Sequence, residues 1–242
     1  MSQTTPRPGS PRWWQNRPPR EPSAEPGPGR PAMSFDRVIR TALELIDEVG
    51  PDDFSMRLLA KRLGSSTATL YRHFKGKDEI LVHVVDHLFG EIPRYLTGVS
   101  PDSTWQAKLT GSAEAMFRTL TQHPRVASLL DDQVPLGPHA LAGREIALGV
   151  LLASGFPPEA AARAFTAVGH YIIGFAGQPG GHEASRQYGK QEIREFYRSL
   201  DAARFPATLA AGPYLPNSLD DEFRFGLQLI VTGLEKHLTE HH

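Results

Sequence analysis

Residues 65–77, SSTATLYRHFKGK, bring hydroxyl, imidazole, guanidinium and ammonium groups together in one short stretch. From Met56 to Lys77 there are six lysines and arginines and no aspartate or glutamate, although the formal net charge of the chain is −1. Cations concentrated in this way are typical of a phosphate-binding surface, and Thr, Arg and His side chains can also reach base edges in the major groove. The alternative is a solvated helical hairpin with a chance excess of cations.

The candidate DNA-contacting side chains all lie in this cationic stretch. They are Arg57, Ser66, Thr67, Ala68, Thr69, Tyr71, Arg72, His73, Lys75 and Lys77.

Metal binding and catalysis find little support in the sequence. Of ten histidines only His83 and His87 have the i, i+4 spacing of two ligands on one helix face, and no glutamate follows His83, so the pattern is not HExxH. The chain has no GxSxG, Walker A or GxGxxG motif. We therefore expect no metal, no cofactor and no enzymatic activity. His170 is compatible with a hydrogen-bonded core histidine or with a polar anchor for a ligand.

The elements that position these side chains are expected to be helices throughout. Apolar residues recur at helical spacing, and no segment alternates with the period of a strand. The expected helices are 35–49, 56–63, 67–74, 77–92, 105–120, 124–130, 138–153, 157–176, 192–200, 206–211 and 219–239, with a loop at 177–190. The sequence thus predicts an all-α fold.

Two of these helices form a helix-turn-helix. Ser55 can cap the first, Gly64 ends it, and a second short helix follows. Leu70 and Phe74 lie four residues apart and can hold the second helix to the core, which leaves Thr67, Arg72 and His73 free to face outward.

Residues 1–32 have a different composition, with nine prolines, five arginines and no apolar period. We interpret them as a disordered, mildly basic tail. The pair Trp13-Trp14 is either an incidental apolar spot or part of a basic arm that touches DNA beside the main site. With no cysteine, no secretory signal and no apolar run long enough to span a bilayer, the chain is expected to be cytoplasmic and not bound to a membrane.

The run from Phe35 to Phe89 resembles the DNA-binding domain of TetR-type repressors. The resemblance depends on the apolar first helix that ends at Gly50, on MRLLAKRLGSSTATLYRHFKGKDEIL, and on the spacing of Leu70, Tyr71, His73, Phe74 and Lys77. It implies that residues 67–73 form the recognition helix. By the same resemblance Thr67, Ala68 and Arg72 read bases, while Tyr71, His73 and Lys77 contact the DNA backbone.

The C-terminal half is similar, more weakly, to the tetracycline-repressor branch. The similarity lies in VPLGP at 134–138 and AFTAVGHYIIGF at 164–175. It implies a C-terminal domain that binds a small effector and dimerises. Where that branch holds magnesium with a histidine and a glutamate, an ungapped alignment places Leu130 and Gln178, which argues against a metal–tetracycline complex.

We therefore expect a mainly apolar or aromatic effector, bound without metal. The residues expected to line its cavity are Phe89, Trp105, Met116, Phe117, Leu120, Phe165, His170 and Tyr171.

Together these patterns predict a tail at 1–32, a DNA-binding domain at 33–80 and an effector-binding and dimerisation domain at 81–242. The expected function is a homodimeric transcriptional regulator, a repressor released from a palindromic double-stranded DNA operator by its effector. One alternative is a helical ligand-binding module or enzyme that has lost its DNA role. Another is an interaction protein whose C-terminal core holds no cavity.

Overall fold

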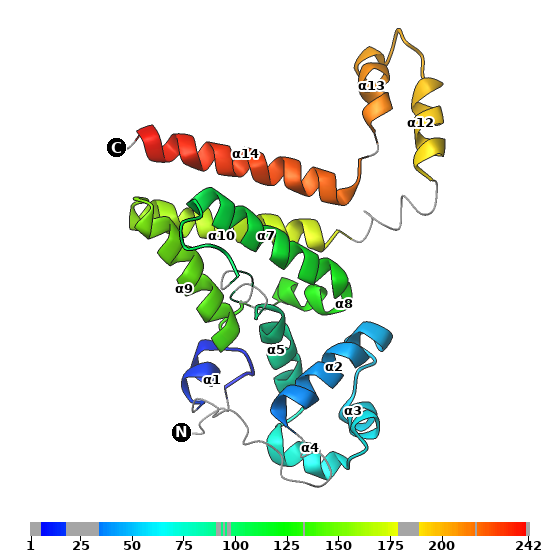
Figure 1. The fold of residues 1–242 in the computed structure, drawn as a ribbon. Helices are drawn as coiled ribbons and strands as arrows, with labels where there is room; N and C mark the ends of the chain where they lie inside the picture. The colour runs from blue at the N-terminus through cyan, green and yellow to red at the C-terminus, as the bar shows by residue number, and fades with distance from the viewer. Residues whose placement is uncertain are drawn as a thin grey trace.

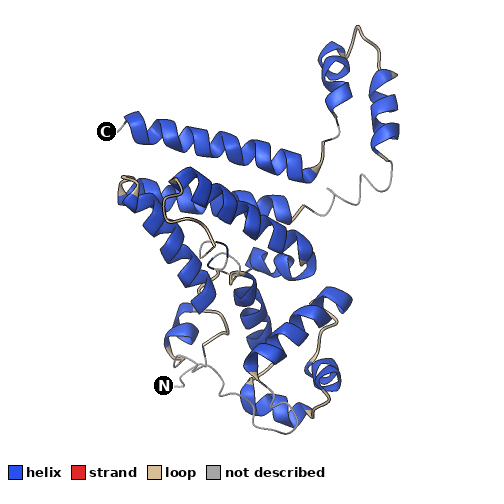
Figure 2. Cartoon of the chain, viewed as in Figure 1, coloured by secondary structure: helices blue, strands red, loops and turns tan. Residues whose placement is uncertain are grey.

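The computed structural model of this chain describes residues 6–17, 34–90, 93, 95, 98–132, 134–178, 189–215 and 217–240. Within these ranges the regular structure is helical and includes no strand, as Figure 2 shows. The all-α prediction is confirmed. No helix in these ranges is long and apolar enough to cross a membrane.

The first compact unit contains α2 (Phe35–Val49), α3 (Met56–Leu63) and α4 (Thr67–His73) (Figure 1). The Ser34 hydroxyl accepts the Arg37 N–H and starts α2, which ends where Gly50 takes a φ of 88°. Of these helices α2 packs on α5 (Lys77–Leu88), which also contacts the helices of the second part of the molecule.

The second part is a helical layer built on α7 (Trp105–Gln122). It contains α8 (Pro124–Ala127), the 3-10 turn η1 (Ser128–Asp132), α9 (Pro138–Ala153) and α10 (Pro158–Ala176). The last helix, α14 (Leu219–Glu240), packs along α7 and α10. In Figure 1, α12 (Lys190–Arg198), α13 (Pro206–Ala211) and the turn η2 (Gly212–Tyr214) stand away from this layer.

One continuous hydrophobic core runs through both parts. It extends from Val38 and Ile39 on α2, through Leu88 on α5, to Phe223 and Leu227 on α14. A smaller cluster joins Leu151, Phe156, Ala161 and Ala164 at the junction of α9 and α10. The expected domain boundary after residue 80 therefore lies inside α5, within this shared core.

The N-terminal tail differs from the sequence expectation of disorder. Residues 6–17 have a defined position and include the short helix α1 (Pro11–Gln15), capped by Ser10. Trp13 is only 6% exposed. Burial of a large aromatic side chain offsets part of the conformational entropy lost on ordering a short segment. The rest of the expected disorder, at 1–5 and 18–32, falls outside the described residues, as does most of the loop expected at 177–190.

Candidate nucleic-acid interface and ligand cavity

The recognition-helix candidate α4 is held to the core by its two apolar side chains. Leu70 is completely buried, and Phe74, directly after the helix, is 2% exposed. The Phe74 ring also stacks on Phe35 of α2, with 5.6 Å between ring centres. Because these anchors fix the inner face of α4, its polar residues face away from the core.

The turn between α3 and α4 depends on local capping. Gly64 ends α3 in the left-handed region with φ 65°, which a glycine adopts without strain. Ser66 then caps α4, because its hydroxyl accepts the Thr69 N–H at 3.1 Å and lies 2.9 Å from the Thr69 hydroxyl. Ser66 and Thr69, both DNA-contact candidates, thus also fix the start of the helix.

The outward face of the helix-turn-helix carries most of the remaining candidates. Thr67, Ala68, Arg72, His73, Lys75 and Arg57 are exposed, and Tyr71 is 55% exposed. The Arg72 guanidinium lies 3.5 Å from the Thr69 hydroxyl, a weak contact that it can exchange for a nucleic-acid acceptor.

Lys77 occupies the first turn of α5. It is half-buried, and its ammonium group donates to the Asp52 carbonyl at 3.0 Å. Gly76 precedes the helix and supplies no side-chain cap to its first N–H groups. A helix N-terminus with an adjacent lysine favours a phosphate at this point.

One of the six cations of the stretch is already paired. Arg62 donates to both carboxylate oxygens of Glu48 on α2, with one N–O distance of 2.9 Å. These hydrogen bonds lower the pKa of the Glu48 carboxyl below its ordinary value. Arg62 therefore contributes less to phosphate attraction than its place in the sequence suggests.

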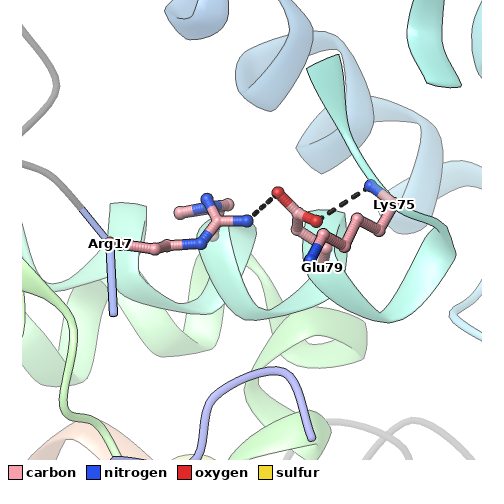
Figure 3. A network of polar contacts seen from close by, with 4 residues as sticks. Arg17, Lys75 and Glu79 are labelled. Atoms are coloured by element: carbon pink, nitrogen blue, oxygen red, sulfur yellow. Dashed lines mark hydrogen bonds and ion pairs between the residues drawn. The ribbon is translucent and has the colours of Figure 1, made fainter. Parts of the chain in front are cut away.

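Sequence reasoning missed the buried acid that supports this surface. Glu79 on α5 is 2% exposed, and one of its carboxylate oxygens accepts the Lys75 N–H at 2.9 Å. The other forms an ion pair with Arg17 from the N-terminal segment (Figure 3). The tryptophan pair in an otherwise proline-rich tail indicated that this segment could pack against the protein, but it did not identify Glu79 as a partner.

A cavity of about 480 Å³ that is open to solvent lies between the start of α7 and the C-terminal half of α9. Its lining residues are Ser103, Trp105, Lys108, Ile146, Gly149, Val150, Ala153 and Ser154. The volume falls within the range of small-molecule sites. The Trp105 ring is fixed edge-on against Phe156, with 5.1 Å between ring centres. This wall combines an aromatic surface with an ammonium group and hydroxyls.

The structure separates the residues that the sequence had grouped as cavity-lining. Trp105 lines the cavity, whereas Met116, Phe117 and Leu120 are packed in the core, and Phe117 stacks on Phe223 at 3.9 Å. His170 is exposed on α10.

The other three aromatic candidates also have partners within the chain. Phe89 is half-buried against the core, and Phe165 lies 5.8 Å from the Arg144 guanidinium. The Tyr171 hydroxyl donates to the Phe223 carbonyl at 2.9 Å.

Comparison with known proteins links both regions to one family. The family model for bacterial regulatory proteins of the tetR family matches residues 38–84. The model for the tetracyclin repressor-like C-terminal domain matches residues 97–238.

Several individual proteins are similar along most of the chain. The HTH-type transcriptional repressor DrrR1 of Streptomyces coeruleorubidus is 31% identical over 227 residues, which cover 89% of this chain and 81% of that protein. The tetracycline repressor protein class C of Escherichia coli is 30% identical over 206 residues, with coverages of 84% and 91%.

Among solved structures, apo ActR from Streptomyces coelicolor superposes with a TM-score of 0.75 at 26% identity, covering 88% of this chain and 100% of that one. ActR in complex with (S)-DNPA gives 0.71 at 28% identity, with coverages of 86% and 100%. ActR in complex with actinorhodin gives 0.67 at 27% identity, with coverages of 85% and 98%.

Proposed function

Because this chain belongs to the tetR family of bacterial regulatory proteins, we propose that it represses transcription as a homodimer on a palindromic operator and leaves the operator when a small molecule binds. The observation that carries the proposal is the exposed face of α4, which presents the side chains of Thr67, Arg72 and His73 to solvent. Its relatives are regulators rather than enzymes. Its site of action is the cytoplasm, where bacterial DNA lies.

Within this proposal the exposed residues of α4 divide by role. Thr67, Ala68 and Arg72 read base edges, whereas Tyr71, His73 and Lys77 bind phosphates. Two copies of α4 in a dimer would enter successive major grooves about 34–36 Å apart, and this two-fold arrangement requires a palindromic site.

Duplexes selected from a random library by the wild-type protein would test operator binding. We expect the selected sequences to contain an inverted repeat and to bind far more tightly than scrambled duplexes of equal length at the same salt concentration. Equal affinity for selected and scrambled DNA would contradict a sequence-specific repressor.

For the effector, we propose a mainly apolar or aromatic small molecule, bound without metal in the cavity beside Trp105. Support comes from the chemistry of the cavity wall and from the structures of ActR in complex with (S)-DNPA and with actinorhodin. A cavity of this size also favours an effector-responsive protein over a ligand-independent interaction protein. The polar side chains in its lining are Ser103, Lys108 and Ser154. Lys108 also donates to the Pro101 carbonyl, and the Ser154 hydroxyl donates to the Val150 carbonyl.

A cavity-filling variant tests this site. Val150→Trp should leave binding to the selected duplex intact and weaken release by candidate small molecules, because the indole would occupy the cavity. Leu120→Trp is a poorer test, since Leu120 is fully buried and an indole there would overpack the core. Release that is abolished by EDTA would contradict the metal-free proposal.

For dimerisation, we propose the outer surfaces of α10 and α14. On α14, Phe225 is 66% and Leu229 59% exposed, and these positions lie one helical turn apart. On α10 the exposed positions 163, 167, 170 and 174 share one face, with small residues at two of them. Adjacent helices with exposed apolar and small side chains favour an isologous four-helix contact.

A further inference from the structure

The N-terminal arm, defined as residues 6–17, is docked on α5, the helix shared by the two parts of the molecule. Trp13 is 6% exposed, and the rings of Trp13 and Trp14 lie 5.6 Å and 5.3 Å from the ring of His83. The Arg17 guanidinium lies 3.9 Å from the centre of the Trp13 ring. The arm therefore makes aromatic and cationic contacts along one side of α5.

The polar end of this contact is the ion pair between Arg17 and Glu79 (Figure 3). A second guanidinium nitrogen of Arg17 lies 3.1 Å from His83 Nε2. Because guanidinium only donates, His83 Nε2 must be the acceptor. Glu79 also accepts the Lys75 N–H, so one buried carboxylate joins the arm to the turn between α4 and α5.

The opposite end of the arm reaches the loop that precedes α9. A small, partly open pocket at this point is lined by Gly9, Trp14, Val82, Val85, Asp86 and residues 134–137. The arm backbone approaches α5 closely at Gly9, where an added Cβ would lie 3.0 Å from a methyl carbon of Val82. The arm thus lies against both α5 and this loop.

The same loop is tied to α5 by a buried carboxylate. Asp86 is 5% exposed and accepts the N–H groups of His139 at 3.3 Å and Ala140 at 3.0 Å, which caps the start of α9. Helix α9 contributes one wall of the 480 Å³ cavity and therefore connects that cavity to α5 through this cap. The arm lies beside the contact between α5 and the loop that precedes α9.

We propose that the arm is an intramolecular clamp that holds α5 in the arrangement that binds DNA. The direction follows from the contacts, because Glu79, the buried partner of Arg17, also accepts the Lys75 N–H in the turn that follows α4, so the arm supports the recognition helix in its present position. Contacts made in only one arrangement shift the population toward it. The proposal rests on the proposed DNA-binding function, to which it adds a control element outside both the recognition helix and the cavity.

The test measures the affinity of full-length variants for the selected duplex at several salt concentrations, without any effector. Trp13→Ala and Arg17→Ala should each weaken binding at least about fivefold, the lower end of typical coupling between sites. The salt slope should stay unchanged, because the arm contacts α5 and not phosphates. Arg12→Ala removes the same charge from an exposed position of α1 and should bind as the wild type does.

Three outcomes would overturn the clamp. Unchanged affinity in both variants would show that the arm does not bias α5. Tighter binding would show that it favours the released arrangement. A salt slope lowered by both Arg17→Ala and Arg12→Ala, with no effect of Trp13→Ala, would show that the arm contacts DNA.

The melting temperature of each variant shows whether the substitution has unfolded the protein as a whole. If Trp13→Ala has done so, Trp13→Leu repeats the test with a smaller packing defect. Failure of the wild type to select any duplex would contradict the repressor function itself.

Discussion

Two side chains of the helix-turn-helix are expected to serve DNA binding in different ways. Lys77 sits at the start of α5, where a phosphate contact carries no base information, whereas Arg72 projects from the exposed face of α4. Lys77→Ala should weaken binding to all sequences and lower the salt slope by about 1 per subunit. The control is Lys190→Ala on the distant α12, which should change neither quantity.

Arg72→Ala should instead relax the preference at one base pair per half-site. A bidentate contact from arginine to guanine contributes about 1–3 kcal/mol of discrimination. The measurement compares the affinities of Arg72→Ala and wild type for duplexes substituted at each half-site position. A uniform loss across all duplexes would assign Arg72 to the backbone.

Tyr171 connects α10 to α14 through its hydrogen bond to the Phe223 carbonyl. Burial raises the pKa of the Tyr171 phenol, and the nearby Glu222 carboxylate raises it further. Because the folded pKa is the higher one, this group's contribution to stability is complete below the ordinary tyrosine pKa of about 10 and is lost as the pH rises through the raised value. Tyr171→Phe should cost about 1 kcal/mol in urea unfolding at pH 8 and less above pH 10. An equal cost at both pH values would contradict this assignment.

At the scale of elements, α10 and α14 approach closely because Gly226 has no side chain. A Cβ at this position would lie 2.2 Å from the Tyr171 hydroxyl oxygen, so Tyr171 would have to move. Gly226→Ala should therefore lower the melting temperature despite the better helix propensity of alanine. Gly149→Ala on α9 meets no atom within 4 Å and should raise it. A stabilised Gly226→Ala would show that α10 and α14 can separate without cost.

The proposed dimer surface gives a second prediction for the same two helices. Leu229→Lys changes a residue that is 59% exposed in one chain, so the subunit should still fold. If this face is covered by a second copy, the charge should dissociate the dimer and weaken operator binding. Sedimentation at micromolar concentration checks this, and Leu152→Lys, at a site 46% exposed on α9, is the matched control. A wild-type protein that sediments as a monomer would contradict the interface.

The helices that could be predicted from the sequence are those whose ends are marked by nearby residues, such as a capping serine or a terminating glycine. Ser34, Ser55 and Ser66 all cap the helices they precede, and Gly50 and Gly64 end the helices before them. The contacts that were not predictable join residues far apart in the chain, such as Arg17 with Glu79 and Asp86 with Ala140. For the same reason the sequence could not separate residues that line the cavity from residues of the core. An apolar residue such as Phe117 is compatible both with a pocket wall and with a core. Only its packing partners, here Phe223, show which of the two it belongs to.

For the whole molecule, the continuous core implies that the two parts unfold together. Leu88 on α5 is 2% exposed and belongs to the cluster that extends from α2 to α14. Leu88→Ala should cost about 2–5 kcal/mol. Circular dichroism and tryptophan fluorescence should report the same shifted transition. Leu152→Ala, at an exposed site, should have little effect. Separate transitions by the two probes would indicate independent domains.

The passage of α5 through both parts also limits how this chain can exchange pieces with its relatives. A crossover after residue 80 would cut α5 between Ile80, which is fully buried, and Leu81, which is 9% exposed. Each part of the recombinant would then carry α5 side chains whose packing partners in the core had been replaced. A recombinant with a new ligand specificity would need to carry Lys77–Leu88 together with the surfaces that pack on it. In this protein the residues that must be transferred together to transfer a ligand response therefore include more than the residues that touch the ligand.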